Sequence, residues 1–141
     1  MTLSKIFIDA NVLIDNFDGD REFHVQSYEA LNYAIRENIN IYTSSDIITT
    51  IYYVLKKRFP DVIEYIKKLS VICNIVGFNN NDLNKAVYLI ETDMNNTFKD
   101  LEDTIQYVIA KKINCDLIIS NDKNFPQKDI KVLSSIKFIE K

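Results

Sequence analysis

The stretch KIFIDANVLID, Lys5–Asp15, ends a short apolar run on an aspartate and places an asparagine two residues later. Asp9 has two interpretations. It can cap a following helix, because Asp accepts hydrogen bonds from the first free backbone N–H groups. It can also lie at the carboxyl edge of a parallel sheet, where open α/β folds bind their ligands. The second interpretation requires other acids that reach the same edge.

The rest of the chain alternates short strand-like runs with longer helix-like ones. The predicted strands are Lys5–Asp9, Ile39–Ser44, Val71–Phe78, Cys115–Ser120 and Ile130–Leu133. The predicted helices are Glu22–Glu37, Asp46 to just before Pro60, Asp61–Ser70, Asp82–Met94 and Asp100–Ile113. This alternation is typical of the α/β class. It predicts a three-layer α/β/α fold around a mainly parallel sheet of four to five strands.

The length of 141 residues and the 47% hydrophobic content predict a single domain over residues 1–141. No apolar run approaches the roughly 20 residues that span a bilayer, and the N-terminus does not have the pattern of a signal peptide. We therefore expect a soluble, cytoplasmic protein with no membrane partner. The net charge of −3 means that any binding of nucleic acid must use local basic patches.

Several classes of chemistry are excluded by scarce residue types. Only two glycines occur, too few for Walker loops or dinucleotide-binding fingerprints. His24 is the only histidine and stands in a polar segment, which makes it a poor general base or metal ligand. Cys73 and Cys115 are isolated and suggest neither zinc nor a disulfide. Nucleophilic catalysis by Ser-His-Asp or Cys-His groups is therefore not expected.

Acidic residues are predicted to gather at one edge of the sheet. Because the carboxyl ends of parallel strands share an edge, Asp9 should lie near Ser120 and Asp122, which follow a later strand. Asp100 and Asp103 are three residues apart, so they lie on one face of their helix. Unpaired carboxylates in a crevice are unfavourable, and a hard cation such as Mg²⁺ or Mn²⁺ offsets their repulsion. Such an ion supports hydrolysis at phosphate without a histidine.

Each acid also has a structural interpretation. Asp9 can be a helix cap, and Asp122 a turn residue in SNDKNFP. Asp100 and Glu102 can be ordinary solvated acids in the first turn of a helix, which is the interpretation we favour for Glu102.

Three segments resemble the PIN-domain family, a set of Mg²⁺/Mn²⁺-dependent nucleases that includes the VapC toxins of bacterial toxin–antitoxin pairs. They are FIDANVLID, YTSSDIITTIYYVLKK and FKDLEDTIQYVIAKKINCDLIISNDKNF. The likeness runs almost from end to end. It implies a PIN-like fold and a metal-dependent endoribonuclease that hydrolyses RNA phosphodiester bonds. It also implies a type II toxin with an antitoxin protein as partner, and a homodimer.

The resemblance implies three catalytic acids that bind Mg²⁺ or Mn²⁺: Asp9, Asp103 and Asp122. Asn11 would steady the loop and its ligand, and Ser120 would form hydrogen bonds within the site. Asp100, one turn before Asp103, would hold a water molecule or a second metal.

The chain departs from the family at Thr50, where most PIN nucleases have a glutamate. Thr50 shares a helical face with Ile47, Ile51 and Val54, so its hydroxyl is predicted to point inward. Asp46, on the same face, either supplies the missing charge through water or caps its own helix. The departure leaves open an enzyme of low activity, or a PIN-like domain that binds RNA or protein without cutting.

Phosphate binding would use basic side chains. Lys123 is the favoured candidate because it adjoins Asp122, and the other basic clusters are Lys56–Arg58, Lys67–Lys68 and Lys111–Lys112. Solvated helix faces are the common explanation for any one of them.

Two other enzyme and signalling classes fit the fold less well. A haloacid-dehalogenase-type phosphatase needs a second aspartate at the position of Asn11, and a receiver-like domain needs a pair of acids at its first strand end.

Overall fold

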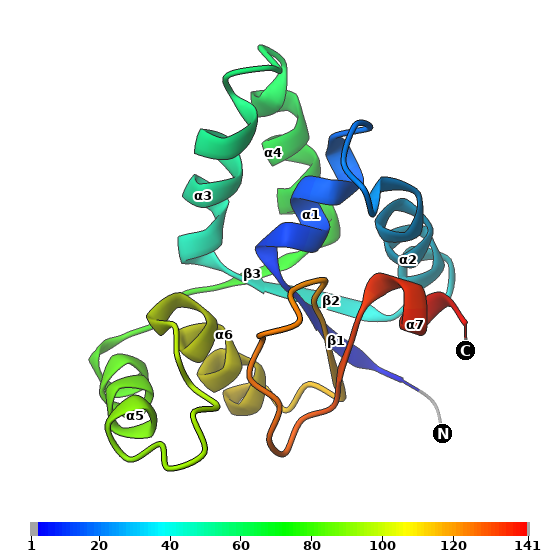
Figure 1. Ribbon diagram of the computed structural model, residues 1–141. Coiled ribbons are helices and arrows are strands. Elements are labelled where there is room, and N and C mark those ends of the chain that lie inside the picture. The colour runs from blue at the N-terminus through cyan, green and yellow to red at the C-terminus, as the bar shows by residue number, and fades with distance from the viewer. Residues whose placement is uncertain (1–2, 141) are drawn as a thin grey trace.

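The computed structural model describes residues 3–140 and is built around one five-stranded sheet (Figure 1). The strand order is β3-β2-β1-β4-β5, and every neighbouring pair is parallel. The strands are β1 (Lys5–Ile8), β2 (Asn40–Ser44), β3 (Asn74–Val76), β4 (Leu117–Ile119) and β5 (Val132–Leu133). The predicted parallel sheet is confirmed, with five strands.

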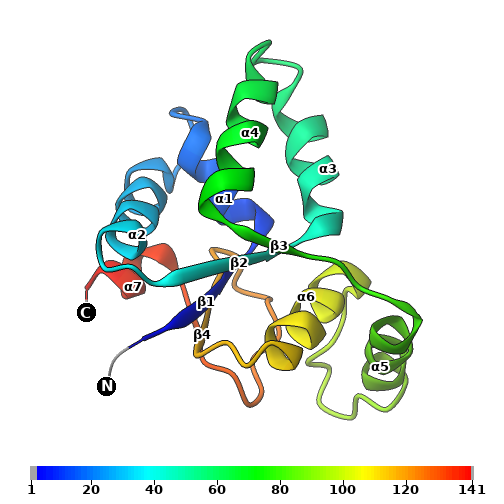
Figure 2. The same cartoon turned by 180° about the vertical axis from the view of Figure 1, so that it is seen from behind.

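Helices cover both faces of the sheet, as a three-layer α/β/α fold requires (Figures 1 and 2). One face carries α1 (Ala10–Phe17), α2 (His24–Arg36), α3 (Ser45–Leu55), α4 (Val62–Ile72) and α7 (Ser135–Ile139). The other carries α5 (Asn80–Glu91) and α6 (Leu101–Lys112). Among the described residues, no helix combines the length and the apolar character needed to cross a membrane.

The central strand β1 shows why the sheet is covered on both faces. Ile6 and Ile8 point into the core under α1–α4, while Phe7 points into the core under α5 and α6. All three side chains are fully buried. A strand with apolar residues on both faces needs helices on both faces. Cys73 and Cys115 are buried and free, as expected of reduced core residues.

The structure differs in several details from the elements expected from the sequence, including the bounds of the helices α3, α4 and α5. The helices α1 and α7 were not predicted, because α1 follows Asp9 without a turn and α7 is only five residues long. The third strand is shorter than Val71–Phe78, because Ile72 still belongs to α4, and a short apolar run does not distinguish a buried strand from a helix end. Val54 does not share the inward face of α3, since 46% of its surface is exposed.

The strand order places a crevice between β1 and β4. From β1 the chain adds β2 and β3 on one side of the sheet, and then returns to place β4 and β5 on the other side. In open α/β sheets, the carboxyl ends of the strands at such a reversal of order form the usual ligand site. Asp9 directly follows β1, and Ser120 directly follows β4.

Candidate active site

Asp9 is both a helix cap and the buried centre of the crevice. It is the N-cap of α1, with its Oδ1 accepting a hydrogen bond of 2.7 Å from the backbone N of Ala10. Its Oδ2 accepts from Asn11 Nδ2 at 2.9 Å and from Ser120 Oγ at 2.8 Å. Only 4% of its surface is exposed. The two interpretations of Asp9 are therefore compatible, because different oxygens serve the cap and the crevice.

The loop after β4 brings Asp122 to the same crevice. Ser120 Oγ accepts a hydrogen bond from the Asp122 backbone N at 3.1 Å while it donates to Asp9. Asp122 Oδ1 in turn accepts from the backbone N of Asn124 at 2.9 Å, which is the geometry of an Asx-turn. Asp122 is thus a turn residue whose carboxylate also lines the pocket.

The first turn of α6 supplies the remaining acids. Asp100 caps the helix, with its Oδ2 accepting from the backbone N of Asp103 at 2.9 Å. Glu102 and Asp103 follow in the first turn and face the crevice. The result is a pocket of about 460 Å³. Its lining residues are Asp9, Ala10, Asn11, Ile14, Thr50, Lys99, Asp100, Glu102, Asp103, Asp122, Asn124 and Pro126.

Glu102 lies beside the position where the usual glutamate is missing. Thr50 on α3 turns its hydroxyl into the pocket, as predicted, and donates to Glu102 Oε2 at 3.4 Å. The interpretation of Glu102 as a solvated surface acid is therefore wrong, because its side chain is partly buried in the pocket. A carboxylate from α6 is therefore hydrogen-bonded to Thr50, at the position where the resemblance predicts a glutamate from α3.

Asp46 does not cap α3. The helix begins at Ser45 with Ser44 at the N-cap, and Asp46 lies inside the first turn. Its Oδ1 is buried and has no hydrogen-bond partner among the described residues. Burial raises the pKa of Asp46, and its negative charge helps to raise the pKa of Glu102. Asp46 therefore adds negative charge near the pocket without lining it.

Burial and mutual repulsion raise the pKa values of three carboxyl groups in this pocket, those of Asp9, Glu102 and Asp103. Burial first, and then the charges of Asp9, Asp100, Asp122 and Glu102, together raise the pKa of Asp103 to about 7. Burial also raises the pKa of Asp9, against the opposing effect of its hydrogen bond from Ser120. The pKa of Glu102 is raised by burial and then by neighbouring acids. The negative charge of this cluster is therefore not compensated by the protein.

The donor set fits a hard divalent cation. Within residues 3–140, none of the five pocket carboxylates forms a salt bridge with a lysine or arginine. In the same part of the chain, no three His, Cys, Asp or Glu side chains already form a closed group of ligands. Mg²⁺ and Mn²⁺ match such an open set, because they are bound by one or two carboxylates together with water and substrate phosphate.

Three residues at or near the pocket were missed from the sequence. Lys99 lines the pocket, whereas the favoured candidate Lys123 is exposed and does not. Gln106, fully buried one turn after Asp103, has its Nε2 at 3.5 Å from Asp103 Oδ1, and its Oε1 has no partner among the described residues. Its spacing on α6 from Asp103 was the only available signal.

Asn121 is the third missed residue, and its hydrogen bonds join the loop after β4 to the three helices α1, α2 and α7. Its backbone N donates to Asn11 Oδ1 at 3.1 Å. Its Nδ2 donates to Asp15 Oδ2 at 2.8 Å and to Ser27 Oγ at 3.0 Å, and its Oδ1 accepts from the backbone N and the hydroxyl of Ser135. Asn121 thus anchors Asn11, which in turn holds Asp9. His24, whose Nδ1 lies 2.8 Å from the Asp15 carbonyl, is outside the acidic pocket.

An acidic pocket at the switch point of a parallel sheet is an arrangement that can hold a divalent cation, and sequence comparison identifies the family. The chain belongs to the PIN-domain family, whose sequence model matches residues 5–124. It is 44% identical over 142 positions to ribonuclease VapC1 of Aquifex aeolicus (strain VF5), an alignment that covers 100% of this chain and 97% of the relative.

Solved structures share the fold at low identity. A toxin–antitoxin complex from Klebsiella pneumoniae superposes with a TM-score of 0.71 at 17% identity, over 92% of this chain and 97% of that one. VapC20 of Mycobacterium tuberculosis, a toxin that cleaves the sarcin–ricin loop, gives a TM-score of 0.69 at 13% identity, over 85% of this chain and 92% of that one. VapBC2 of Rickettsia felis, bound to a DNA fragment from its promoter, gives a TM-score of 0.67 at 14% identity, over 92% of this chain and 98% of that one.

Proposed function

We propose that this protein is a divalent-metal-dependent endoribonuclease and the toxin of a type II toxin–antitoxin pair. One observation carries the proposal: Asp9, the α6 residues Glu102 and Asp103, and Asp122 come from three separate segments and line one pocket, and none of them forms a salt bridge among the described residues. The 44% identity to a ribonuclease over the whole chain supports the choice of RNA as substrate.

In this proposal the carboxylates of Asp9, Asp103 and Asp122 hold a Mg²⁺ or Mn²⁺ ion, and Glu102 supplies the charge that Thr50 lacks. When bound, the ion supplies the positive charge that stabilises phosphate oxygens during an in-line displacement. Asp9 is kept in place by Asn11 and Ser120, through hydrogen bonds to its Oδ2 of 2.9 and 2.8 Å.

The other polar residues of the pocket have roles around this set. Asp100 fixes the first turn of α6 by capping it, and so sets where the Asp103 carboxylate points. Lys99 lines the pocket and attracts a phosphate of the RNA backbone there, while Lys123, exposed outside the pocket, would contact a neighbouring phosphate. Asp46 contributes long-range negative charge that favours the cation.

The wider setting follows from the same proposal. Residues 1–141 act as a single PIN-like domain, which works in the cytoplasm, where its RNA substrate is, and forms a homodimer. An antitoxin protein inhibits it. Antitoxin complexes among the structural neighbours support this partner for a chain of the same fold.

The test is cleavage of labelled RNA by the purified protein with Mn²⁺, repeated with EDTA and with the variants Asp9→Asn and Asp103→Asn. We expect cleavage by the wild type with Mn²⁺ and none by either variant or with EDTA. Cleavage that persists in both variants would exclude the proposed site.

Calorimetric titration with Mn²⁺ separates the enzyme from a domain that only binds. Intact RNA together with no heat of Mn²⁺ binding would favour a catalytically silent PIN-like domain. Binding of Mn²⁺ by the wild type, and its loss in Asp103→Asn, supports the metal site independently of cleavage.

A further inference from the structure

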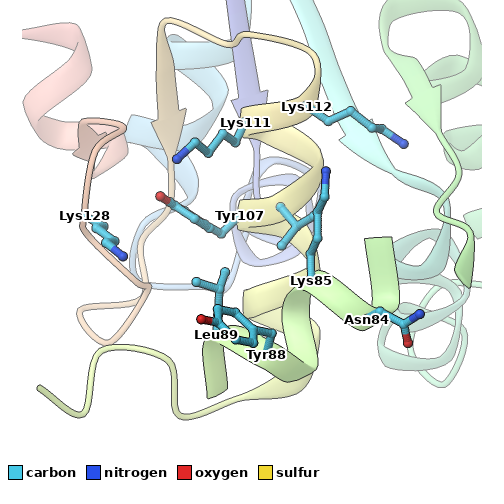
Figure 3. A pocket seen from close by; sticks show the side chains of 9 residues that line it. Asn84, Lys85, Tyr88, Leu89, Tyr107, Lys111, Lys112 and Lys128 are labelled. Atoms are coloured by element: carbon cyan, nitrogen blue, oxygen red, sulfur yellow. The ribbon is translucent and has the colours of Figure 1, made fainter. Parts of the chain in front are cut away.

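A second pocket, of about 590 Å³, lies between α5, α6 and the loop before β5 (Figure 3). Its size is within the roughly 300–1,000 Å³ of small-molecule sites. Its lining residues are Asn84, Lys85, Tyr88, Leu89, Tyr107, Val108, Lys111, Lys112 and Lys128. Lysines come from all three of these segments, so the pocket is basic in a chain whose net charge is −3.

Two of its four lysines are already paired. Lys112 Nζ lies 2.8 Å from Asp82 Oδ2, and Lys111 forms an ion pair with Asp129. Both also lie in the last turn of α6, where a cation is favourable. Lys85 and Lys128 have no ion pair within residues 3–140.

The pocket also has an aromatic wall. Tyr88 on α5 is 65% exposed, a large exposure for an aromatic side chain, while the neighbouring Tyr107 is buried. Figure 3 shows Tyr88 and Leu89 on the α5 side of the opening, with Lys85 on the same helix and Lys128 across from it. An exposed ring in a pocket with lysines that form no ion pair is typical of sites for single-stranded nucleic acid, in which a base stacks on the ring and the lysines bind phosphates.

Two segments of the chain contribute residues to both the acidic pocket and the basic pocket. Asp100, Glu102 and Asp103 at the start of α6 line the acidic pocket, and four residues nearer the end of the same helix line the basic one: Tyr107, Val108, Lys111 and Lys112. Pro126 belongs to the acidic pocket and Lys128, two residues later, to the basic one. At 1.5 Å per residue along a helix, Asp103 and Lys111 are about 12 Å apart. A strand of a few nucleotides spans that distance.

We propose that this basic pocket is a second RNA-binding subsite, which holds one nucleotide of a single-stranded RNA whose phosphodiester lies in the acidic pocket. Tyr88 stacks on the base, and Lys85 and Lys128 bind its flanking phosphates. The proposal rests on the proposed ribonuclease function and extends it, because it gives the enzyme a preference for substrates that reach beyond the cleaved bond.

The test measures binding and so does not depend on cleavage. Wild type and variants bind a fluorescent single-stranded RNA of about 12 nucleotides in EDTA, with fluorescence anisotropy followed over a range of salt concentrations. We expect Tyr88→Ala to weaken binding about tenfold, and Tyr88→Phe, which keeps the ring, to bind as the wild type does. The double variant Lys85→Ala/Lys128→Ala should lower the slope of log K against log salt by about 1.4, or about 0.7 per lost phosphate contact.

Lys137→Ala is the matched control, because Lys137 is an exposed lysine of α7, on the other face of the sheet, and lines neither pocket. It should leave the salt slope unchanged. Equal affinity and equal slope in the wild type, Tyr88→Ala and the double variant would overturn the proposal. Unchanged RNA binding combined with lost binding of poly-glutamate would overturn it in favour of an acidic protein partner.

Cleavage separates this subsite from the proposed activity itself. With Mn²⁺, the pocket variants should raise KM for the longer RNA and leave cleavage of a dinucleotide substrate unchanged. Absence of all cleavage in the wild type would count against the proposed function alone, because the binding measurements would still test the subsite.

Discussion

Replacing Asp103 by asparagine should stabilise the protein in the absence of metal. In the folded protein the pKa of Asp103 is raised from 3.8 to about 7, first by burial and then by the neighbouring acids Asp9, Asp100, Asp122 and Glu102. At pH 8 the wild type must therefore keep a charged carboxylate where the structure favours a neutral one. Asparagine has nearly the same shape and no charge, so it removes that unfavourable term.

The sign and size of this change in stability follow from proton linkage. The folded state binds this proton more tightly than the unfolded chain does, so the stability it contributes is fully present below pH 3.8 and is lost as the pH rises through about 7. About three pH units at about 1.4 kcal/mol each set an upper limit of about 4 kcal/mol at pH 8. The pocket is open to water, which reduces the expected gain to about 1–2 kcal/mol, or about 3–8 °C in Tm.

Thermal unfolding followed by circular dichroism in EDTA, from pH 4 to pH 8, measures this effect. The Tm of Asp103→Asn should exceed that of the wild type at pH 8, and the gap should close as the pH falls towards 4. Added Mn²⁺ should raise the Tm of the wild type and not that of the variant. Asp61→Asn is the control, because Asp61 is an exposed acid outside the acidic pocket. A gap that does not change with pH, or a less stable variant at pH 8, would refute the reasoning.

Three further predictions concern the residues around the metal ligands. Glu102→Gln should weaken Mn²⁺ binding, measured by calorimetry, about tenfold. Adding Thr50→Glu to that variant should restore binding, because residues 50 and 102 are in contact and the carboxylate moves only from one to the other. No recovery would show that the position of the charge matters more than its presence. Ser120→Ala removes the 2.8 Å hydrogen bond to Asp9 and should raise the pKa of Asp9 further. Because protons then compete with Mn²⁺ for Asp9, Mn²⁺ binding should weaken more at pH 6 than at pH 8. Equal weakening at both pH values would contradict this. Asn121→Ala leaves several buried polar partners unsatisfied and should lower the free energy of unfolding in urea by about 2–4 kcal/mol, a change that an exposed Asn would not cause.

The sequence alone determined the fold class of the molecule and the edge of the sheet at which the acids gather. The apolar run Ile6–Ile8, with apolar residues on both sides of the strand, requires a sheet that is buried on both faces, and the alternation of strands and helices makes that sheet parallel. The carboxyl ends of parallel strands share one edge, so Asp9 and Asp122 had to lie near each other, and helical spacing added Asp103. Periodicity and chain direction are local properties, which is why they could be predicted.

Contacts between distant elements were decided only by the tertiary structure. Glu102 and Thr50 are 52 residues apart, and no spacing in the chain indicates that α3 and α6 bring them together. The hydrogen bonds of Asn121 to α1, α2 and the N-terminus of α7 also join segments that are distant in the sequence. The pocket lined by Lys85, Tyr88 and Lys128 could not be predicted either, because each of these residues resembles an ordinary solvated residue in the sequence. The physical reason is that sequence patterns indicate which face of an element is buried, whereas the packing of whole elements decides which side chains meet.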